Sequence, residues 1–258
     1  MITCNLQGGI GNQMFQIAST ISHAKKMGSE YFFDFDKCQT PNQGKKSTHY
    51  SNSVFRKIKN DSLLKYNSLS SYQEPSYNFS ELPHIDNVVL NGYFQSEKYF
   101  KNHEKFIKDI FYFNDVDKEV NDFLNSIKQG KTITSIHVRR GDYLKFIDVH
   151  PICSLDYYQK SMELIGESNF IVISDDIDWC KENIKGDNVF YSEYMDDIYD
   201  LSVIKNCDYN INANSSFSWW GAWLNENPNK KVIIPKIWFG TNKKLNIKDL
   251  IPNKWKKI

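Results

Sequence analysis

Residues 1–35 read MITCNLQGGIGNQMFQIASTISHAKKMGSEYFFDF, and this stretch decides the fold of the first half of the chain. Met1–Leu6 is short and apolar, a glycine-rich turn follows it, and apolar residues then recur at helical spacing until Met27-Gly28, a typical helix end. Tyr31–Phe35 is expected to form a second strand. Strand, turn, helix and strand make half of a doubly wound unit, so we predict the α/β class.

The second half of the chain alternates apolar strands with helices, which indicates a parallel sheet covered on both faces. We predict two Rossmann-like, doubly wound domains, residues 1–130 and 131–258, with a loop-rich insertion at 37–85 and a C-terminal tail that crosses back. The expected strands are Val88–Leu90, Thr132–Val138, Phe170–Ile173, Val189–Tyr191, Tyr209–Asn212 and Val232–Ile234. The expected helices are Ser96–Phe111, Val116–Gln129, Ser154–Gly166, a short helix ending near Gly186, Asp196–Cys207 and Phe217–Asn225.

The composition limits the classes of partner. The 258 residues carry a net charge of +1, which is no footprint of nucleic-acid binding. Aromatic side chains make up 15%, enough to build a core and to line a sugar site. Nine Lys and one acid lie between Asn229 and Ile258. This bias is typical of a solvated surface. Its sharper interpretation is weak attraction to an anionic substrate or to anionic lipid, as in peripheral contact with the inner face of the cytoplasmic membrane.

The cysteines and the apolar runs bear on the compartment. An odd count of five cysteines, without a CxxC pair, argues against a disulfide framework or a structural zinc site. The start shows no charged segment followed by an apolar stretch, and no apolar run approaches the ~20 residues that span a bilayer. We therefore expect a cytoplasmic protein.

The glycine-rich turn Gly8-Gly9-Ile10-Gly11-Asn12-Gln13 follows a strand and opens a helix. The dinucleotide fingerprint needs a third glycine where Met14 stands, so the match fails. Glycines still let the backbone approach a ligand, and Asn12 and Gln13 can donate hydrogen bonds to it. A tight turn with a polar helix cap explains the same residues equally well.

The segment His137-Val138-Arg139-Arg140-Gly141-Asp142-Tyr143 lies where an expected parallel strand ends, which is where doubly wound sheets bind ligands. Two adjacent guanidinium groups are suited to bidentate binding of a pyrophosphate. The alternative is that they pair with acids such as Asp142. His137 lies inside the strand, which favours a structural role.

Two further motifs follow strands of the same half. Asp175 and Asp176 can accept hydrogen bonds from a base or ribose, cap the next helix, or, as a weaker interpretation, hold a divalent metal. The segment from Asn214 to Phe217 opens a helix, where free N–H groups and hydroxyls suit a phosphate. An ordinary serine cap is the simpler explanation, and the three tryptophans that follow are expected to pack. Together the motifs predict a phosphate and nucleotide site.

These segments resemble a known family. GGIGNQMFQIA, HVRRGDY and ANSSFSWWGAWL are similar to motifs of bacterial α-1,2-fucosyltransferases, glycosyltransferase family 11. SLDYY, SDD and VIIPKIWF extend the resemblance from residue 2 to about residue 240. The resemblance implies a GT-B-like fold with two domains facing a cleft, and GDP-β-L-fucose as the donor substrate, without a metal or other cofactor. It implies inverting transfer to the 2-hydroxyl of a terminal galactose in O-antigen, lipopolysaccharide or H-type oligosaccharides.

The resemblance also assigns residues. Arg139 and Arg140 are expected on the pyrophosphate, Asp200 near the serine motif, and the second domain is expected to hold GDP-fucose. The residues so expected at the donor are Asn12, Gln13, His137, Arg139, Arg140, Asp175, Asp176, Asn214, Ser215, Ser216 and Phe217.

Inversion needs in-line attack by the acceptor hydroxyl and stabilisation of the departing GDP, which Arg139 and Arg140 can provide. Asp142, Asp148 and His150 are the candidates for a base that removes the hydroxyl proton, and the sequence does not choose between them. A dissociative mechanism needs no strong base.

Two other classes of protein fit part of the sequence. An NAD-dependent oxidoreductase fits the first strand, turn and helix, but the missing glycine argues against it. A glycan-binding protein without catalysis fits the aromatic content, but it does not need the paired arginines. Assays for fucose transfer, NAD reduction and plain glycan binding separate the three.

Overall fold

The computed structural model describes residues 1–40, 44–61, 69–194, 196–241 and 245–258, which form two compact units. Unit 1 comprises Met1–Tyr112 and Asn246–Pro252, and unit 2 comprises Phe113–Leu245 and Asn253–Ile258. The end of the chain therefore leaves unit 2, adds a short segment to unit 1 and returns to unit 2.

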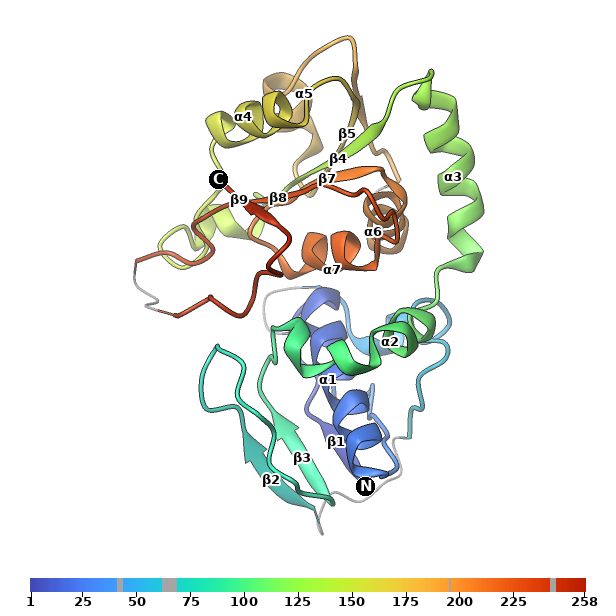
Figure 1. Ribbon diagram of the computed structural model, residues 1–258, viewed down its shortest axis with the longest axis vertical. Helices are drawn as coiled ribbons and strands as arrows, with labels where there is room; N and C mark the ends of the chain where they lie inside the picture. Colours follow the sequence, from blue (N-terminus) through green and yellow to red (C-terminus); the bar gives the residue numbers. More distant parts are fainter. Residues whose placement is uncertain (41–43, 62–68, 195, 242–244) are drawn as a thin grey trace. The chain divides into compact units, whose positions relative to one another are not determined.

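Unit 1 is built on a parallel three-stranded sheet in the order β1-β3-β2, with helix α1 directly after the first strand (Figure 1). Its elements are β1 (Ile2–Cys4), α1 (Ile10–Met27), the 3₁₀ turn η1 (Ser47–Tyr50), β2 (Ser70–Gln73), β3 (Val88–Asn91), the 3₁₀ turns η3 (Glu97–Tyr99) and η4 (Lys101–His103), and α2 (Glu104–Ile110).

Three expectations for unit 1 need correction. Tyr31–Phe35 is no regular strand, because it joins its neighbours only through isolated bridges from Tyr31 and Phe33. The segment 37–85, of which residues 41–43 and 62–68 lie outside the described residues, contributes strand β2, whose sequence SSYQ shows no apolar alternation. The segment 96–111 is two 3₁₀ turns and one short helix rather than a continuous helix.

The returning segment Asn246–Pro252 is fastened within unit 1 through Asp249. The Ser96 hydroxyl donates to the Asp249 carbonyl oxygen at 2.6 Å, and the Lys98 ammonium pairs with the Asp249 carboxylate at 2.5 Å. Leu250 and Ile251 beside it are buried. Local polar bonds and apolar burial thus both hold this segment.

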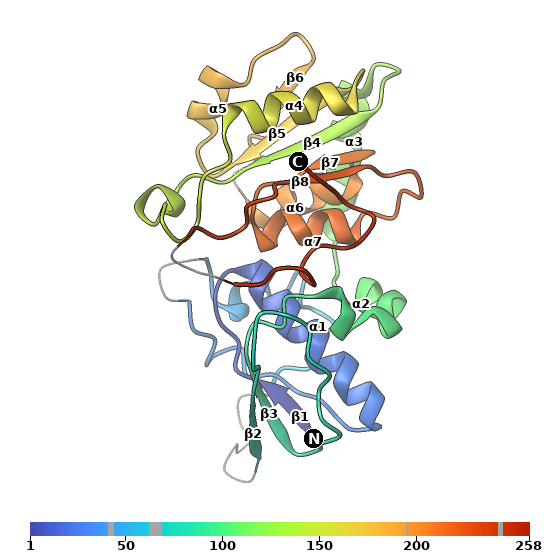
Figure 2. The same cartoon turned by 60° about the vertical axis from the view of Figure 1, so that its left-hand side comes forward.

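Unit 2 contains a parallel six-stranded sheet in the order β6-β5-β4-β7-β8-β9 (Figures 1 and 2). Numbered from β4, this is the 3-2-1-4-5-6 order of doubly wound nucleotide-binding sheets, in which the strand order reverses between β4 and β7. The elements are α3 (Asn114–Lys128), β4 (Ile133–Val138), η5 (Asp142–Lys145), α4 (Leu155–Ile165), β5 (Asn169–Ser174), α5 (Ile177–Asn183), β6 (Val189–Tyr191), α6 (Asp197–Asn206), β7 (Tyr209–Ile211), α7 (Ser216–Leu224), β8 (Val232–Ile234) and β9 (Lys256–Lys257).

Two apolar layers cover the sheet of unit 2, because successive strand side chains point to opposite faces. Phe170 and Val172 of β5 pack with residues of α4 and α5, whereas Ile171 and Ile173 pack with residues of α3 and α6. Figure 2 shows α4 and α5 on one side of the strands and α6 and α7 on the other. The prediction of a parallel sheet covered on both faces is confirmed for this unit.

Unit 1 ends before α3, not after it at residue 130. The apolar side chains Val120, Leu124 and Ile127 of α3 pack with strand residues Ile133 and Ile171, so the helix belongs with the sheet of unit 2. Helix periodicity locates α3 in the sequence, but it cannot tell which sheet the helix covers.

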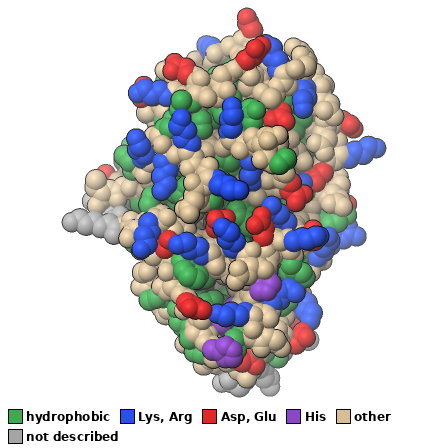
Figure 3. Space-filling view, viewed as in Figure 1, with side chains coloured by type: hydrophobic (Ala, Val, Ile, Leu, Met, Phe, Trp, Pro, Cys, Tyr) green, Lys and Arg blue, Asp and Glu red, His purple; other side chains and the backbone are tan. Residues whose placement is uncertain are grey.

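The surface and the cysteines add little to the question of compartment. Among the described residues, no helix combines the length and apolar character needed to cross a membrane. The five cysteines, all within the described ranges, carry free thiols. On the face shown in Figure 3, basic side chains are interspersed with acidic ones rather than gathered into one basic patch.

Candidate active site

The sequence motifs of unit 2 meet at one edge of its sheet. Arg139 follows β4, Asp175 follows β5, and Asn214 follows β7. These three strands are neighbours and parallel, so their carboxyl ends lie side by side at the point where the strand order reverses. That edge is the ligand-binding position of doubly wound sheets.

Arg139 is held by two carboxylates. One terminal nitrogen of its guanidinium lies 2.5 Å from Asp142 Oδ1, and the other lies 3.1 Å from Asp175 Oδ2. The guanidinium carbon also lies 5.5 Å from the centre of the Tyr143 ring. The Arg139 side chain remains 29% exposed, so a bound anion can reach it from solvent.

Arg140 is held differently. Its Nε lies 2.9 Å from Asp176 Oδ2, and its guanidinium lies 3.9 Å from the ring centre of Trp179. The backbone N–H of Arg140 donates to Asp175 at 2.9 Å. Stacking and the Nε bond fix the plane of the guanidinium while leaving the terminal nitrogens for a further acceptor such as a phosphate.

Gly141 lets the loop after β4 lie close to the loop after β5. A Cβ at this position would stand 2.4 Å from Asp175 Oδ2, so any other residue would force the Asp175 carboxylate to move. Glycine therefore allows Asp175 to accept the Arg140 N–H and to contact Arg139 at once. The arrangement of both arginines depends on this close approach.

Helix α7 begins beside the arginine loop. The Ser215 hydroxyl caps the helix by accepting from the Phe217 N–H at 3.3 Å, and Ser216 is the first helical residue. The first N–H groups of a helix lack partners within the helix and favour negative charge. The start of α7 is thus able to bind a phosphate, as the sequence predicts for Ser216.

Asn214 uses its side chain inside the protein. Its amide nitrogen donates to the Pro151 and Trp238 carbonyls at 2.9 and 3.0 Å, and its carbonyl oxygen accepts from the Cys153 thiol at 3.6 Å. The Tyr143 hydroxyl donates to the Asn214 backbone carbonyl at 3.0 Å. Asn214 therefore anchors the α7 loop to its neighbours, and its side chain is not presented to a ligand.

His137 is buried and neutral. Desolvation and, second, the nearby Arg139 charge lower the pKa of its imidazole to about 3. The ring packs 5.3 Å from the Phe217 ring, and its Nδ1 is buried with no hydrogen-bond partner among the described residues. His137 thus packs the end of β4 against the start of α7, in line with the structural role that its place in the strand favours.

The candidates for a base have different surroundings. Asp142 Oδ1 already accepts from Arg139. His150 is half-buried and stacks on Tyr143, with ring centres 4.7 Å apart and an angle of 19° between the planes. Asp148 is exposed on the same loop. All three candidates follow the arginines closely in the sequence. Aromatic packing against Tyr143 fixes the ring orientation of His150.

Asn12 and Gln13 lie in unit 1 and serve its turn. Gln13 is fully buried; its amide nitrogen donates to the Gly8 and Lys45 carbonyls at 2.8 and 2.9 Å, and its oxygen accepts from the Ser47 hydroxyl at 2.9 Å. Asn12 is half-buried and its oxygen accepts from Gln95 at 2.7 Å. As placed, Gln13 has no group left for a substrate, whereas the Asn12 amide group is partly accessible.

Sequence reasoning missed Trp179, which supports Arg140. The available signal was its position three residues after Asp176, since Asp176 caps α5 by accepting from the Trp179 N–H at 3.4 Å. Among the described residues, no group of three or more His, Cys, Asp or Glu side chains is placed to hold a metal ion.

Comparison with known proteins decides the family. The protein-family model described as "Glycosyl transferase family 11" matches residues 1–257. The chain belongs to this family. It is 30% identical to an alpha-1,2-colitosyltransferase of Escherichia coli, over 100% of this chain and 99% of the relative. It is 23% identical to galactoside alpha-(1,2)-fucosyltransferase 2 of Oryctolagus cuniculus, over 87% of this chain and 67% of the relative.

A solved structure supports the fold. The alpha-1,6-fucosyltransferase NodZ from Bradyrhizobium, in a crystal soaked with GDP-fucose, matches with a TM-score of 0.52 and 14% identity, over 86% of this chain and 91% of NodZ. At this identity the likeness shows the fold alone. This family member thus has the GT-B-like α/β fold that the sequence predicted.

Proposed function

We propose that this family 11 glycosyltransferase transfers L-fucose from GDP-β-L-fucose to the 2-hydroxyl of a terminal β-galactose, with inversion. The observation that carries the proposal is the arginine pair at the strand reversal of unit 2, beside the start of α7. Two guanidinium groups and helix N–H groups together fit the pyrophosphate of a nucleotide sugar. The relative from Oryctolagus cuniculus is named a galactoside alpha-(1,2)-fucosyltransferase, which supports a galactoside acceptor and a fucosyl donor.

We propose that the main role of the two aspartates after β5 is to position the two arginines. Asp175 contacts Arg139 and the Arg140 N–H, and Asp176 contacts Arg140 Nε. Such contacts orient the guanidinium groups before the donor arrives, which lowers the cost of ordering them on binding. The resemblance of the SDD motif to the family also leads us to propose that one of these aspartates contacts the guanosine.

The reaction breaks the bond between the fucose anomeric carbon and the β-phosphate oxygen, and forms a bond from that carbon to the acceptor oxygen. Negative charge develops on the departing GDP, and we assign Arg139, Arg140 and the α7 N–H groups to its stabilisation. The acceptor proton leaves late, and His150 or Asp142 is the proposed acceptor of that proton. No metal is assigned a role.

Colitose is the second candidate for the transferred sugar, because the E. coli relative with 30% identity is named for it. Colitose lacks the 3-hydroxyl of fucose. A site that hydrogen-bonds a substrate hydroxyl rejects the deoxy analogue by up to about 10⁴–10⁵, whereas a site lacking that bond discriminates weakly. Comparing the two donors therefore reports directly on the sugar pocket.

The test measures kcat/KM for GDP-fucose and GDP-colitose with lactose as the acceptor. We expect GDP-fucose to be preferred by at least about 100-fold, with an α-1,2 linkage in the product by NMR. Preference for GDP-colitose would assign the second candidate. Transfer from neither donor, together with no protection of the protein by GDP against thermal unfolding, would remove the proposed nucleotide site.

Location in the cytoplasm, with weak contact to the membrane, is also proposed. Lys256 and Lys257 are exposed on the edge strand β9, where charge also discourages pairing with another sheet. Sedimentation with anionic vesicles at low and high salt separates these roles. Pelleting at low salt only is expected, because screening weakens surface attraction, and no pelleting at either salt leaves edge protection alone.

A further inference from the structure

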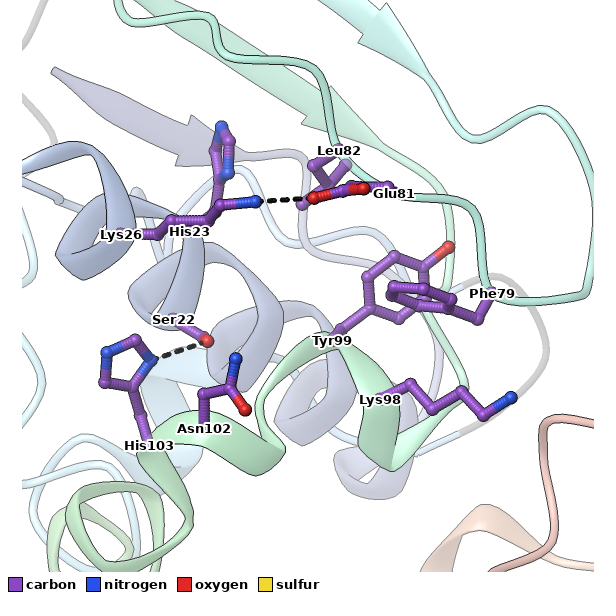
Figure 4. A pocket seen from close by; sticks show the side chains of 10 residues that line it. All are labelled: Ser22, His23, Lys26, Phe79, Glu81, Leu82, Lys98, Tyr99, Asn102 and His103. Carbon is purple, nitrogen blue, oxygen red and sulfur yellow. Dashed lines mark hydrogen bonds and ion pairs between the residues drawn. The ribbon is translucent and has the colours of Figure 1, made fainter.

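A cavity of about 310 Å³ lies within unit 1, away from the motifs described above (Figure 4). It is bounded by the second half of α1, by the turns η3 and η4, and by the segment 79–82. Its volume is at the lower end of the range for small-molecule sites. We call it the α1 pocket; its lining includes Ser22, His23, Phe79, Tyr99, Asn102 and His103.

The α1 pocket is distant from the glycine turn. Ser22 lies ten residues after Asn12 on the same helix, and at 1.5 Å per residue this separates them by about 15 Å. The turn stands at the carboxyl end of β1, whereas the pocket lies toward the other end of α1. One sugar ring therefore cannot occupy both places.

Two aromatic rings form a rigid apolar wall of the pocket. Phe79 and Tyr99 pack edge to face with ring centres 4.9 Å apart, and Phe94 supports Tyr99 from 5.3 Å. The Tyr99 hydroxyl is fixed as well, since it accepts from the Ser80 N–H at 3.1 Å and donates to Glu74 at 3.3 Å. An aromatic wall held in place suits the C–H face of a sugar ring.

Four other lining residues are polar and uncharged: Ser22, His23, Asn102 and His103. The His103 Nδ1 lies 2.9 Å from the Ser22 hydroxyl, and the His23 Nε2 lies 3.3 Å from the Ile85 carbonyl, so that His23 Nε2 carries its proton. Burial lowers the pKa of both imidazoles; the bond to Ile85 opposes this shift at His23, and the Lys25 charge adds to it at His103. In Figure 4 the Asn102 amide points up from η4 toward α1. Neutral imidazoles and an amide both donate and accept, as hydroxyl groups require.

The two lysines of the lining are already paired. Lys26 lies 2.8 Å from Glu81, and Lys98 lies 2.5 Å from Asp249. Their charges are thus compensated within unit 1, and the pocket carries no unpaired cation to select an anion. An uncharged ligand with an apolar face and several hydroxyls matches this lining better than a phosphate does.

We propose that the α1 pocket binds an uncharged pyranose of the glycan acceptor, other than the galactose that receives the transferred sugar. This proposal rests on the proposed function, because it assumes a glycan acceptor that reaches beyond the reaction site. It makes unit 1 a second point of contact, which favours longer acceptors over a minimal disaccharide by linking two weak binding events.

Kinetics with acceptors of two lengths test the proposal. Lactose and the β-galactose-terminated tetrasaccharide lacto-N-neotetraose are compared in the wild type, in Phe79→Ala and in the matched control Phe106→Ala, an exposed aromatic residue of α2 outside the pocket. We expect Phe79→Ala to lower kcat/KM for the tetrasaccharide about tenfold and for lactose less than twofold, with Phe106→Ala changing neither. Equal losses on both acceptors, or no loss on either, would overturn the proposal.

Binding without a donor separates this proposal from the proposed function. Saturation-transfer NMR of the tetrasaccharide should give signals with the wild type that weaken in Phe79→Ala, and in Asn102→Ala should the first variant fold poorly. If the wild type gives these signals and Phe79→Ala weakens them, while neither donor supports transfer, the proposed function fails and the assignment of the α1 pocket stands. Absence of the signals, or their displacement by inorganic phosphate, contradicts the assignment to an uncharged sugar.

Discussion

The two units place a turn after their first strand, but they use the polar side chains there in opposite ways. In unit 1 Gln13 is fully buried, and both polar atoms of its side chain form hydrogen bonds, with Gly8, Lys45 and Ser47. In unit 2 the Arg139 and Arg140 side chains are 29% and 16% exposed and are held only in part by carboxylates. The same topological position thus serves as a scaffold in one unit and as a binding edge in the other.

A covering segment causes the difference. Gly44 adopts a φ of +75°, and a Cβ there would stand 2.7 Å from the Gly9 Cα, so residues 44–47 lie directly on the turn of unit 1. Glycine permits this close approach of two backbones. Within the part of the chain that the structure describes, no comparable segment satisfies the terminal nitrogens of Arg140. A glycine-rich turn therefore does not by itself indicate a ligand site.

The largest effect should come from replacing the arginines of unit 2. Arg139→Lys and Arg140→Lys keep the charge but lose the planar fork, so we expect at least one of them to lower kcat by about 10²–10³. Because the stabilisation grows in the transition state, kcat should fall together with kcat/KM. Initial rates at saturating donor give the first value, and thermal unfolding provides the control. If both variants keep near-full kcat and GDP affinity, the arginines are structural.

The motifs of unit 2 were predictable because a parallel sheet brings the ends of its strands to one edge. Ser154, which caps α4 by accepting from the Tyr157 N–H, and Gly166, which follows that helix, were likewise readable from local chemistry. The ion pairs of Asp175 with Arg139 and of Asp176 with Arg140 were not, because each joins residues 36 positions apart on different loops. The bonds of Gln13 were unpredictable for the same reason, because its partners Lys45 and Ser47 lie in a segment with weak periodicity.

The comparison of the two turns predicts that replacing Gln13 lowers the stability of unit 1. Gln13→Ala leaves the Gly8 and Lys45 carbonyls and the Ser47 hydroxyl without their partner, which should destabilise unit 1 by about 2–4 kcal/mol. GDP affinity should stay unchanged, because the arginines lie in unit 2. Chemical denaturation and GDP titration measure the two quantities. Weaker GDP or acceptor binding at full stability would return Gln13 to the substrate site.

Within unit 2, the half-buried carboxyl of Asp200 allows a test by pH. Burial, opposed by the Ser192 hydrogen bond and reinforced by Asp196 and Asp197, raises the pKa of Asp200 to about 6. Between pH 4 and 6 the unfolded chain has released this proton while the folded chain keeps it, so stability falls as pH rises through this window. With 1.36 kcal/mol per pKa unit, the cost above pH 6 is at most about 3 kcal/mol.

Asp200→Asn should remove that cost. We expect the variant to be more stable than the wild type at pH 7.5 by up to about 2 kcal/mol, and nearly equal to it at pH 4. Thermal unfolding across this range measures the difference. A variant that is less stable at pH 7.5 would show that the bond from the Ser192 hydroxyl at 2.6 Å outweighs the burial of the charge.

The smallest expected effect on activity is that of a chelator. This experiment tests which unit supplies the positive charge that stabilises the departing GDP. We expect transfer to continue in excess EDTA, because Arg139 and Arg140 are assigned the charge of the departing GDP. Unit 1 offers the sequence Asp34-Phe35-Asp36, but the Asp34 carboxylate is buried and pairs with Lys37 at 3.0 Å. Loss of activity in EDTA that manganese restores would contradict the assignment to the arginines. In that case Asp34→Asn and Asp36→Asn become the next variants, and a fall in manganese affinity in either one would move the charge stabilisation from unit 2 to unit 1.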